Sequence, residues 1–269
     1  MGTARHAVVV LCCAVLLPAQ QVVERAEMIE FGDVAQRLDA DAATAGKVGA
    51  TDRFAGVMRL LLQDDVAPKR RPATVSRVTK QDRLIVRGSV DNIALVKGAI
   101  AQLRLASPPR ARLQCSLLVV PAASAPALGL EAGKVQAADE TAFGKLVRDA
   151  VKQKGALQNL PEALADPLVP FTVEPAVKGK PAEPDTARRL RGEMVSLPDG
   201  EVALAMQLVR GTLPADRTET PPAALLNRVF RLAAGKGVMV LIVDKDEAVV
   251  LFVRCTEIVG EAAQDKAGR

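Results

Sequence analysis

Residues Arg83–Leu103 constrain the fold of this chain more than any other stretch, because they predict a strand, a tight turn and a capped helix in succession. Leu84–Val86 form a short apolar run of the kind found in strands. Gly88 permits a sharp exit, Ser89 is placed to cap the helix, and Asp91 favours the helix dipole. The helix should bury the residues that recur at a spacing of three or four: Val90, Ile93, Val96, Ile100 and Leu103.

The N-terminal residues have the pattern of a secretory signal. Arg5 precedes the apolar run Ala7–Leu17, and Pro18 and Ala19 follow it. We therefore expect cleavage near Ala19, so that residues 1–19 are a signal peptide and the mature chain is exported to the periplasm or cell envelope. Because no later segment is long and uncharged enough to cross a bilayer as a helix, we predict no integral membrane span in the mature chain.

The composition removes several classes of chemistry. The chain has one histidine, His6, and neither tryptophan nor tyrosine. Since His6 lies in the expected signal, the mature chain cannot use Ser-His-Asp or Cys-His catalysis, and it cannot bind a metal through histidine. We predict no enzyme, no cofactor and no small-molecule partner, and we assign no catalytic, cofactor-binding or metal-binding residue.

A secreted hydrolase that uses carboxylates stays as an alternative. The acidic groups available for it are Asp64 with Asp65, Asp139 with Glu140, and Asp244 with Asp246 and Glu247. All three groups fall where loops or turns are expected. A hairpin turn also explains Asp244–Glu247 better than a calcium site, because the run lacks the ligand spacing and central glycine of an EF-hand. Ser89 and Ser116 have no partner base nearby in sequence.

Two cysteines, Cys115 and Cys255, follow the expected signal, and each lies in an apolar segment of strand character. Two interpretations are open. The cysteines can form a disulfide in an exported protein, or each can be a small buried core residue.

The first half of the chain predicts a β-α-β-β-α module over residues 22–106. A first strand is expected at Glu27–Phe31, and Asp52 should cap a helix whose buried face includes Phe54, Val57, Met58, Leu61 and Leu62. The strands Val75–Thr79 and Arg83–Arg87 then flank a polar turn. Asp33–Ala50 is alanine-rich and predicts at most a helical turn followed by a loop.

Ser107, Pro108 and Pro109 predict a boundary, beyond which residues 110–260 form a second domain. Thr141–Lys154 should be a helix with Phe143 inward and Gly155 as its C-cap. The expected strands of this domain are Leu113–Val120, Leu168–Val173, Leu190–Leu197, Glu201–Leu213, Asn227–Ala233, Val238–Val243 and Ala248–Ile258. Turn signals between them predict an antiparallel sheet, which makes the fold class α+β, and residues 261–269 should be a flexible tail.

The order of elements and the run Arg83–Leu103 resemble the small periplasmic N-domain of bacterial secretins, the outer-membrane channels of type II and type III secretion and of type IV pili. In that family an apolar strand, an Arg-Gly turn, a polar cap and a helix ending in Ile-x-x-Leu follow one another, as they do here up to Leu103. Leu113–Val120 and the hairpins Gly192–Val209 and Val229–Val259 are similar to the secretin core.

This resemblance implies an exported, non-enzymatic scaffold or accessory protein that acts by protein-protein association in secretion or pilus assembly. Its partners would be other proteins or further copies of itself, in a ring or another homo-oligomer, with Arg83, Arg87 and Lys97 selecting the register. A membrane-embedded barrel normally carries aromatic girdles, whereas this chain has six phenylalanines and no other aromatic side chain. Because the aromatic girdles are missing, we expect a secretin-like scaffold without a pore.

A KH-like nucleic-acid-binding module is the other alternative. Gly46–Gly49 fits the GxxG loop with which KH domains clamp a nucleotide backbone. The formal net charge is +5 and includes the cluster Lys69–Arg71, but charges of both signs are mixed along the chain. Because export separates the chain from nucleic acid, we predict no nucleic-acid partner.

Overall fold

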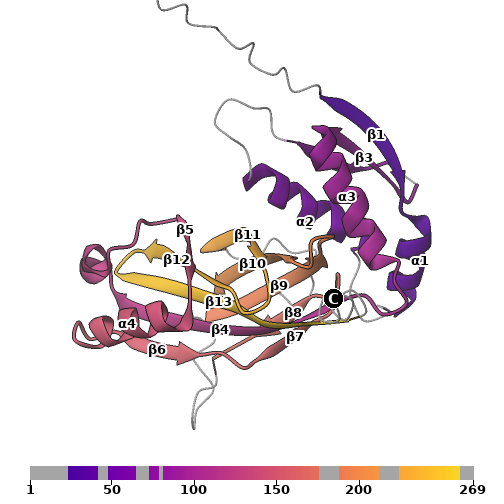
Figure 1. Cartoon of the computed structure of the whole chain (residues 1–269). Coiled ribbons are helices and arrows are strands. Elements are labelled where there is room, and N and C mark those ends of the chain that lie inside the picture. The colour runs from indigo at the N-terminus through magenta and orange to yellow at the C-terminus, as the bar shows by residue number, and fades with distance from the viewer. Residues whose placement is uncertain are drawn as a thin grey trace, which may run out of the picture.

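The computed structural model describes residues 24–41, 48–64, 73–78, 81–175, 188–211 and 224–260. The expected signal peptide, the Lys69–Arg71 cluster and the expected tail lie outside these ranges. The described elements stack in layers, with a small N-terminal sheet and its helices packed against a sandwich of two further sheets (Figure 1). Helices and antiparallel sheets thus occur together, which confirms the α+β class.

The N-terminal sheet has the order β1-β3-β2, with both pairs antiparallel. Its elements in chain order are β1 (Arg25–Glu30), α1 (Gly32–Asp41), α2 (Ala50–Asp64), β2 (Thr74–Arg77), β3 (Arg83–Gly88) and α3 (Val90–Leu103). The stretch expected to hold one helical turn contains the whole of α1, so the observed order has one helix more than the sequence predicts.

The strand, turn and helix predicted for Arg83–Leu103 are all present. The Ser89 hydroxyl accepts a hydrogen bond from the Asn92 backbone N–H at 3.2 Å, as expected of an N-cap. The helix buries Ile93, Val96, Ala99, Ile100 and Leu103. Val90 was expected in this face but is 53% exposed, and it is the first residue of α3.

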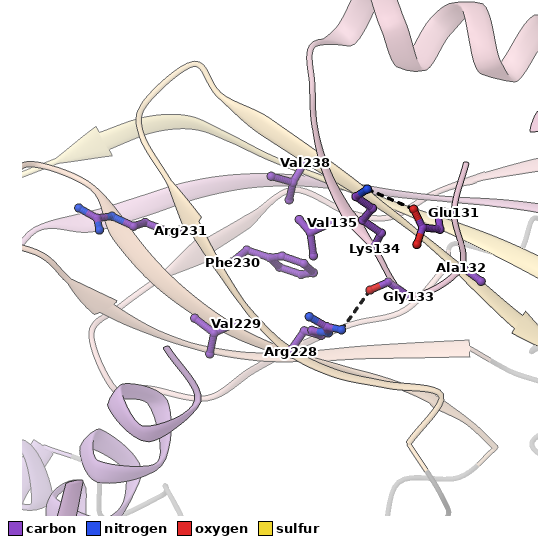
Figure 2. Close-up of a pocket in the computed structure, with 10 residues that line it drawn as sticks. All are labelled: Glu131, Ala132, Gly133, Lys134, Val135, Arg228, Val229, Phe230, Arg231 and Val238. Atoms are coloured by element: carbon purple, nitrogen blue, oxygen red, sulfur yellow. Dashed lines mark hydrogen bonds and ion pairs between the residues drawn. The ribbon is translucent and has the colours of Figure 1, made fainter. Parts of the chain in front are cut away.

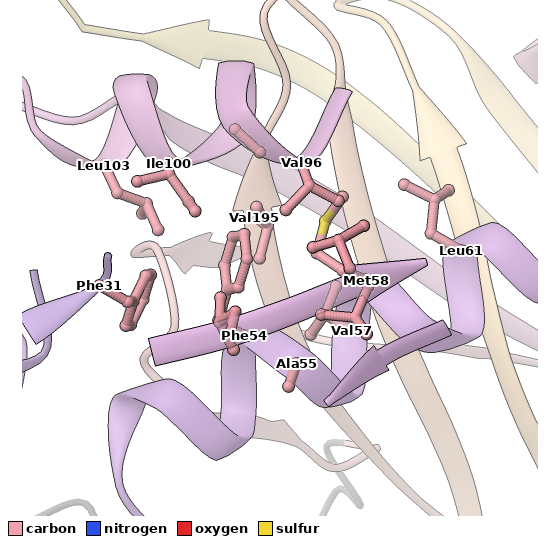
Figure 3. Packing of buried hydrophobic residues seen from close by; sticks show 14 of the residues in the cluster. Phe31, Phe54, Ala55, Val57, Met58, Leu61, Val96, Ile100, Leu103 and Val195 are labelled. Atoms are coloured by element: carbon pink, nitrogen blue, oxygen red, sulfur yellow. The ribbon is translucent and has the colours of Figure 1, made fainter. Parts of the chain in front are cut away.

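Helix α2 is buried on two sides, between the N-terminal sheet and the outer face of the larger domain. Phe54 and Met58 are fully buried, and the Phe54 ring lies 5.0 Å from that of Phe31, centroid to centroid (Figure 3). The expectation that Asp52 caps this helix is wrong: α2 begins at Ala50, whose backbone N–H donates to the Asp39 carboxylate at 2.8 Å. Asp52 instead lies in the first turn.

The larger domain is a sandwich of a six-stranded and a four-stranded sheet, and every named strand pair in it is antiparallel. The first sheet has the order β5-β12-β13-β4-β6, with β7 also paired to β4, and the second has the order β11-β10-β9-β8. The strands are β4 (Arg110–Pro121), β5 (Val135–Ala138), β6 (Ala156–Asn159), β7 (Ala163–Ala165), β8 (Phe171–Val173), β9 (Arg188–Ser196), β10 (Val202–Arg210), β11 (Leu226–Leu232), β12 (Gly237–Asp244) and β13 (Glu247–Val259).

All seven strands expected for this domain are present, with ends shifted by up to three residues. The strands β5, β6 and β7 were not expected, because they are too short to show a clear alternation. Leu168 was expected in a strand but has a positive φ of 58° and lies in a turn before β8.

Each face of the six-stranded sheet has its own core. Leu113, Cys115 and Leu117 point between the two sheets, whereas Leu118 and Val120 point toward α4 (Glu140–Val151) and the 3-10 helix η1 (Ala122–Leu128). This alternation is what a strand covered on both faces produces.

The expected C-cap of α4 at Gly155 is wrong. Helix α4 ends at Val151 with Lys152 as its C-cap, and the left-handed residue of the turn that follows is Lys154, with a φ of 63°. A side chain at Gly155 would meet the Ala150 carbonyl oxygen at 2.8 Å, so the glycine is needed for close approach to the helix rather than for its backbone angles.

The outer face of the four-stranded sheet shares a core with the N-terminal elements. Val195, Leu197 and Ala203 from β9–β10 pack in the same cluster as Phe54 and Met58 of α2 (Figure 3). Within the described ranges, none of the helices is long and apolar enough to cross a membrane.

Candidate functional site

The acidic groups considered for catalysis have structural roles. Asp139 is the N-cap of α4 and accepts a hydrogen bond from the Ala142 backbone N–H at 2.7 Å, while Glu140 pairs with Arg254 at 2.5 Å. Asp64 ends α2, and Asp65 lies outside the described residues. Asp139 and Glu140 are therefore used by a helix cap and an ion pair.

Asp244 and Glu247 flank the turn between β12 and β13 and connect the two sheets of the sandwich. Asp244 pairs with Arg210 at 3.0 Å, and Glu247 pairs with the buried Arg188. Arg188 and Arg210 are register partners on β9 and β10, just as Asp244 and Glu247 are on β12 and β13. Two cationic side chains of one sheet therefore face two anionic side chains of the other.

Ser116, Arg83 and Lys97 were singled out in the sequence and have identifiable partners, while Arg87 is exposed on β3. The Ser116 hydroxyl donates to the side-chain oxygen of Asn159 on the adjacent β6 at 3.1 Å. Arg83 pairs with Glu30 at 2.6 Å, and Lys97 pairs with Glu27 at 2.5 Å, so both hold β1 in place within the chain itself. Across the part of the chain that the structure describes, no group of three or more histidine, cysteine, aspartate or glutamate side chains is suited to hold a metal ion.

Cys115 and Cys255 are both free and buried on adjacent strands. Cys115 lies opposite Val253 and Cys255 lies opposite Leu113, so the thiols are diagonal neighbours rather than a facing pair. Burial raises the pKa of Cys115 to about 12 and that of Cys255 to about 11. The structure therefore agrees with the second interpretation, in which each cysteine is a buried core residue and no disulfide joins them.

These pKa values predict unreactive thiols. At pH 8 almost none of either cysteine is thiolate, the form that attacks disulfide reagents, and the core excludes the reagent as well. We expect the chain from Gln20 onward to release less than about a tenth of the colour of two thiols when 5,5′-dithiobis(2-nitrobenzoic acid) is added to the native protein. In guanidinium chloride both should react within minutes. Rapid reaction of a native thiol would contradict this placement of the side chains.

A groove of about 460 Å³ opens where the edges of the two sheets face each other (Figure 2). One wall is the edge strand β11, and the other is β5 with the turn before it. The groove contains the nearly buried ring of Phe230 together with the half-buried Val135 and Val238. These three side chains form an apolar interior, whereas polar groups make up the larger part of the whole lining.

Charged groups lie around this apolar interior. The Arg228 Nη2 atom donates to the Gly133 carbonyl oxygen at 3.1 Å, so this side chain spans from one sheet to the other. Glu131 and Lys134 form an exposed ion pair at 3.1 Å on the opposite wall (Figure 2). The turn between them is held to β12, because the Gly133 N–H donates to the Leu241 carbonyl at 2.8 Å.

The two strands that form the walls are both edge strands. Within the described residues, β11 has a strand partner only in β10, and β5 has one only in β12. An edge strand presents unpaired backbone N–H and C=O groups to a further strand. On the opposite side the end strands are β8 and β6, and the chain links the two sheets there, because β7 leads directly into β8 and the Leu168 N–H donates to the Met194 carbonyl oxygen at 2.8 Å.

Sequence reasoning did not find this groove, because its walls come from segments about a hundred residues apart. One signal was available. Arg228 stands between Leu226 and Phe230 at a position that alternation assigns to the interior, and an inward-facing charge is typical of an edge strand. The residues of the predicted GxxG loop are elsewhere: Gly49 precedes α2, and Gly46 lies outside the described residues.

No family model matches this chain, and none of the curated proteins compared with it matches either. Among solved structures, it is similar to the secretin domain β-barrel of InvG from the Salmonella SPI-1 injectisome, with 13% identity, 79% of this chain and 83% of that chain covered, and a TM-score of 0.28. It is also similar to the type IV competence pilus secretin PilQ of V. cholerae, with 10% identity, 89% and 78% covered, and a TM-score of 0.29.

A third similar structure is the type II secretion secretin XcpQ of Pseudomonas aeruginosa, with 8% identity, 93% of this chain and 78% of that chain covered, and a TM-score of 0.28. Superpositions at this level carry no argument about what this chain does.

Proposed function

We propose that this chain is an exported, non-enzymatic, secretin-like scaffold that associates with a second copy of itself through the open edge of its β sandwich. The observation that carries the proposal is that β11 and β5, both edge strands in the described structure, lie on the same side of the sandwich, with the ring of Phe230 in the groove between them. Strand addition to such an edge supplies backbone hydrogen bonds, and the groove supplies apolar area.

The same side of the sandwich favours one kind of assembly. Because β11 and β5 end the two sheets on the same side, association through this side places the open edge of one copy against the open edge of another. A contact of this kind uses the same surface on both partners and has two-fold symmetry. Arg228 and Lys134 would be paired across it with acceptors of the second copy, including Glu131, which favours one register.

The placement of the acidic residues supports a non-enzymatic role. Asp139, Asp244 and Glu247 are engaged in a helix cap or in ion pairs with arginine, which is how structural carboxylates are used. A carboxylate hydrolase needs two such groups facing a common substrate, and these are distributed among different contacts.

The link to secretion or pilus assembly rests on the sequence resemblance of Arg83–Val120 to secretins. Export through a signal peptide at residues 1–19, envelope localisation, and a division into domains at residues 22–106 and 110–260 belong to the same proposal. Val195 and Ala203 share a core with α2, so the two domains would act as one rigid unit in the assembly.

Light scattering after size-exclusion chromatography tests the association. We expect the chain from Gln20 onward to have the mass of a dimer at high micromolar concentration and to dissociate on dilution. Consecutive backbone N–H groups of a strand point to opposite sides, so of Asn227 and Arg228 one donates toward β10 and the other points outward. Proline at the outward position removes the outward N–H donor and leaves the hydrogen bonds between β10 and β11 intact. That variant should keep its melting temperature and become a monomer.

Lys145→Ala is the control for loss of a charge away from the open edge, because Lys145 is exposed on α4, and it should keep the mass of the dimer. Two outcomes would overturn the proposal: a strictly monomeric chain at high micromolar concentration, or a dimer that persists in whichever proline variant remains folded.

A further inference from the structure

A second cavity, of about 310 Å³, lies between α2 and the outer face of the four-stranded sheet. It is separate from the groove at the sheet edges. Arg53, Gly56 and Leu60 line it from the helix at a spacing of three or four residues, and Arg191, Gln207 and Asn227 line it from the sheet. The cavity lies next to the apolar contact of α2 with Val195 and Ala203, and its own lining is more polar than that contact.

Arg53 is the unusual residue of this cavity, because its charged side chain is only 3% exposed. Its Nη1 atom donates to the Val48 carbonyl oxygen, and its Nη2 atom lies 3.5 Å from the Asp39 carboxylate. Its Nε atom is buried and has no hydrogen-bond partner. A buried donor left without an acceptor costs about 1–3 kcal/mol, so an acceptor supplied by a ligand would be favourable at this position.

Gly56 opens the helical wall of the cavity. A Cβ atom built at this position meets nothing within 4 Å, so a larger side chain here would extend into free space. Glycine in the middle of a helix is less favourable than alanine by about 1 kcal/mol. The helix is therefore less stable at Gly56, in the part of α2 that lines the cavity.

The sheet supplies a row of hydrogen-bonding side chains across three strands. Arg191 on β9 lies opposite Gln207 on β10, and Gln207 lies opposite Asn227 on β11. A guanidinium and two carboxamides provide several N–H donors on one line. Guanidinium groups bind both carboxylates and phosphates in a bidentate manner, and the nearby Glu193 disfavours a dianion such as phosphate more strongly than a monoanionic carboxylate.

We propose that this cavity binds a carboxylate, with Arg53 and Arg191 as the principal donors and Gln207 and Asn227 completing the site. The carboxylate is the C-terminus of a peptide or a free small acid, since the cavity accepts either chemistry. At about 310 Å³ the cavity is at the small end of the range for ligand sites, which fits one or two terminal residues.

Isothermal titration calorimetry tests the site, because the chain has no tryptophan or tyrosine to report binding by fluorescence. The probes are N-acetyl-Ala-Ala with a free C-terminus, the same peptide as its C-terminal amide, acetate and inorganic phosphate. We expect saturable binding of the free-acid peptide and at least tenfold weaker binding of the amide. If acetate binds as tightly as the peptide, the natural ligand is a free small acid.

Gly56→Leu fills the cavity from the helix and should weaken binding at least tenfold. Gly56→Ala adds a single methyl group and should retain binding within about threefold, while circular dichroism confirms that both variants are folded. The proposal is overturned if no carboxylate probe saturates, if phosphate binds more tightly than every carboxylate, or if Gly56→Leu binds as the unchanged chain does. Since the readout is binding rather than mass, failure here is distinguishable from failure of the proposed dimer.

Discussion

Replacing Phe54 with alanine should lower the free energy of unfolding by about 3–5 kcal/mol, which is the usual cost of removing a fully buried phenylalanine. The Phe54 ring has no exposed surface and lies against Phe31, with which it makes a tilted contact at 5.0 Å. The cavity left behind could not collapse easily, because α2 is held between two sheets. Urea unfolding followed by circular dichroism at 222 nm measures the loss.

Gln63→Ala is the matched control, since Gln63 is exposed on the same helix. It should change the free energy of unfolding by less than about 0.5 kcal/mol. A Phe54→Ala variant as stable as this control would show that α2 is not packed between the two sheets as described.

The elements that could be predicted from the sequence are those whose signals are local. The cap at Ser89 and the strand Arg83–Gly88 follow from neighbouring residues, and the structure has both. The start of α2 could not be predicted in this way. Its first backbone donor is satisfied by Asp39, which belongs to the preceding helix, so Asp52 was a reasonable but wrong choice of cap.

The candidate sites depended on contacts between distant segments. From the sequence, Arg53 is an ordinary charged residue of a helix, and only its place against the outer face of β9–β11 makes it part of a cavity. The groove in turn exists because the edges of two sheets lie next to each other. The acidic run Asp244–Glu247 could be assigned to a turn, but its pairing with arginines depends on the register of β9 and β10, which no local pattern specifies.

Replacing Glu247 with alanine should lower the free energy of unfolding by about 3 kcal/mol, because it leaves a buried arginine without its counter-charge. Arg188 is 9% exposed, and its Nη2 atom donates to the Glu247 carboxylate. Its register partner Arg210 is a second cation, whose own counter-charge is Asp244. Loss of Glu247 therefore leaves two arginines facing one carboxylate at this end of the sandwich. Thermal and urea unfolding both measure the effect.

The double variant Arg188→Met with Glu247→Ala separates the buried charge from the loss of packing. Methionine fills the space of the arginine stem without a charge, so the pair should recover stability to within about 1 kcal/mol of the unchanged chain. Glu131→Ala removes a carboxylate from an exposed pair and should cost less than about 0.5 kcal/mol. If Glu247→Ala were as mild as Glu131→Ala, the pair at β9 and β13 would be a surface contact, and the apolar core alone would hold the two sheets together.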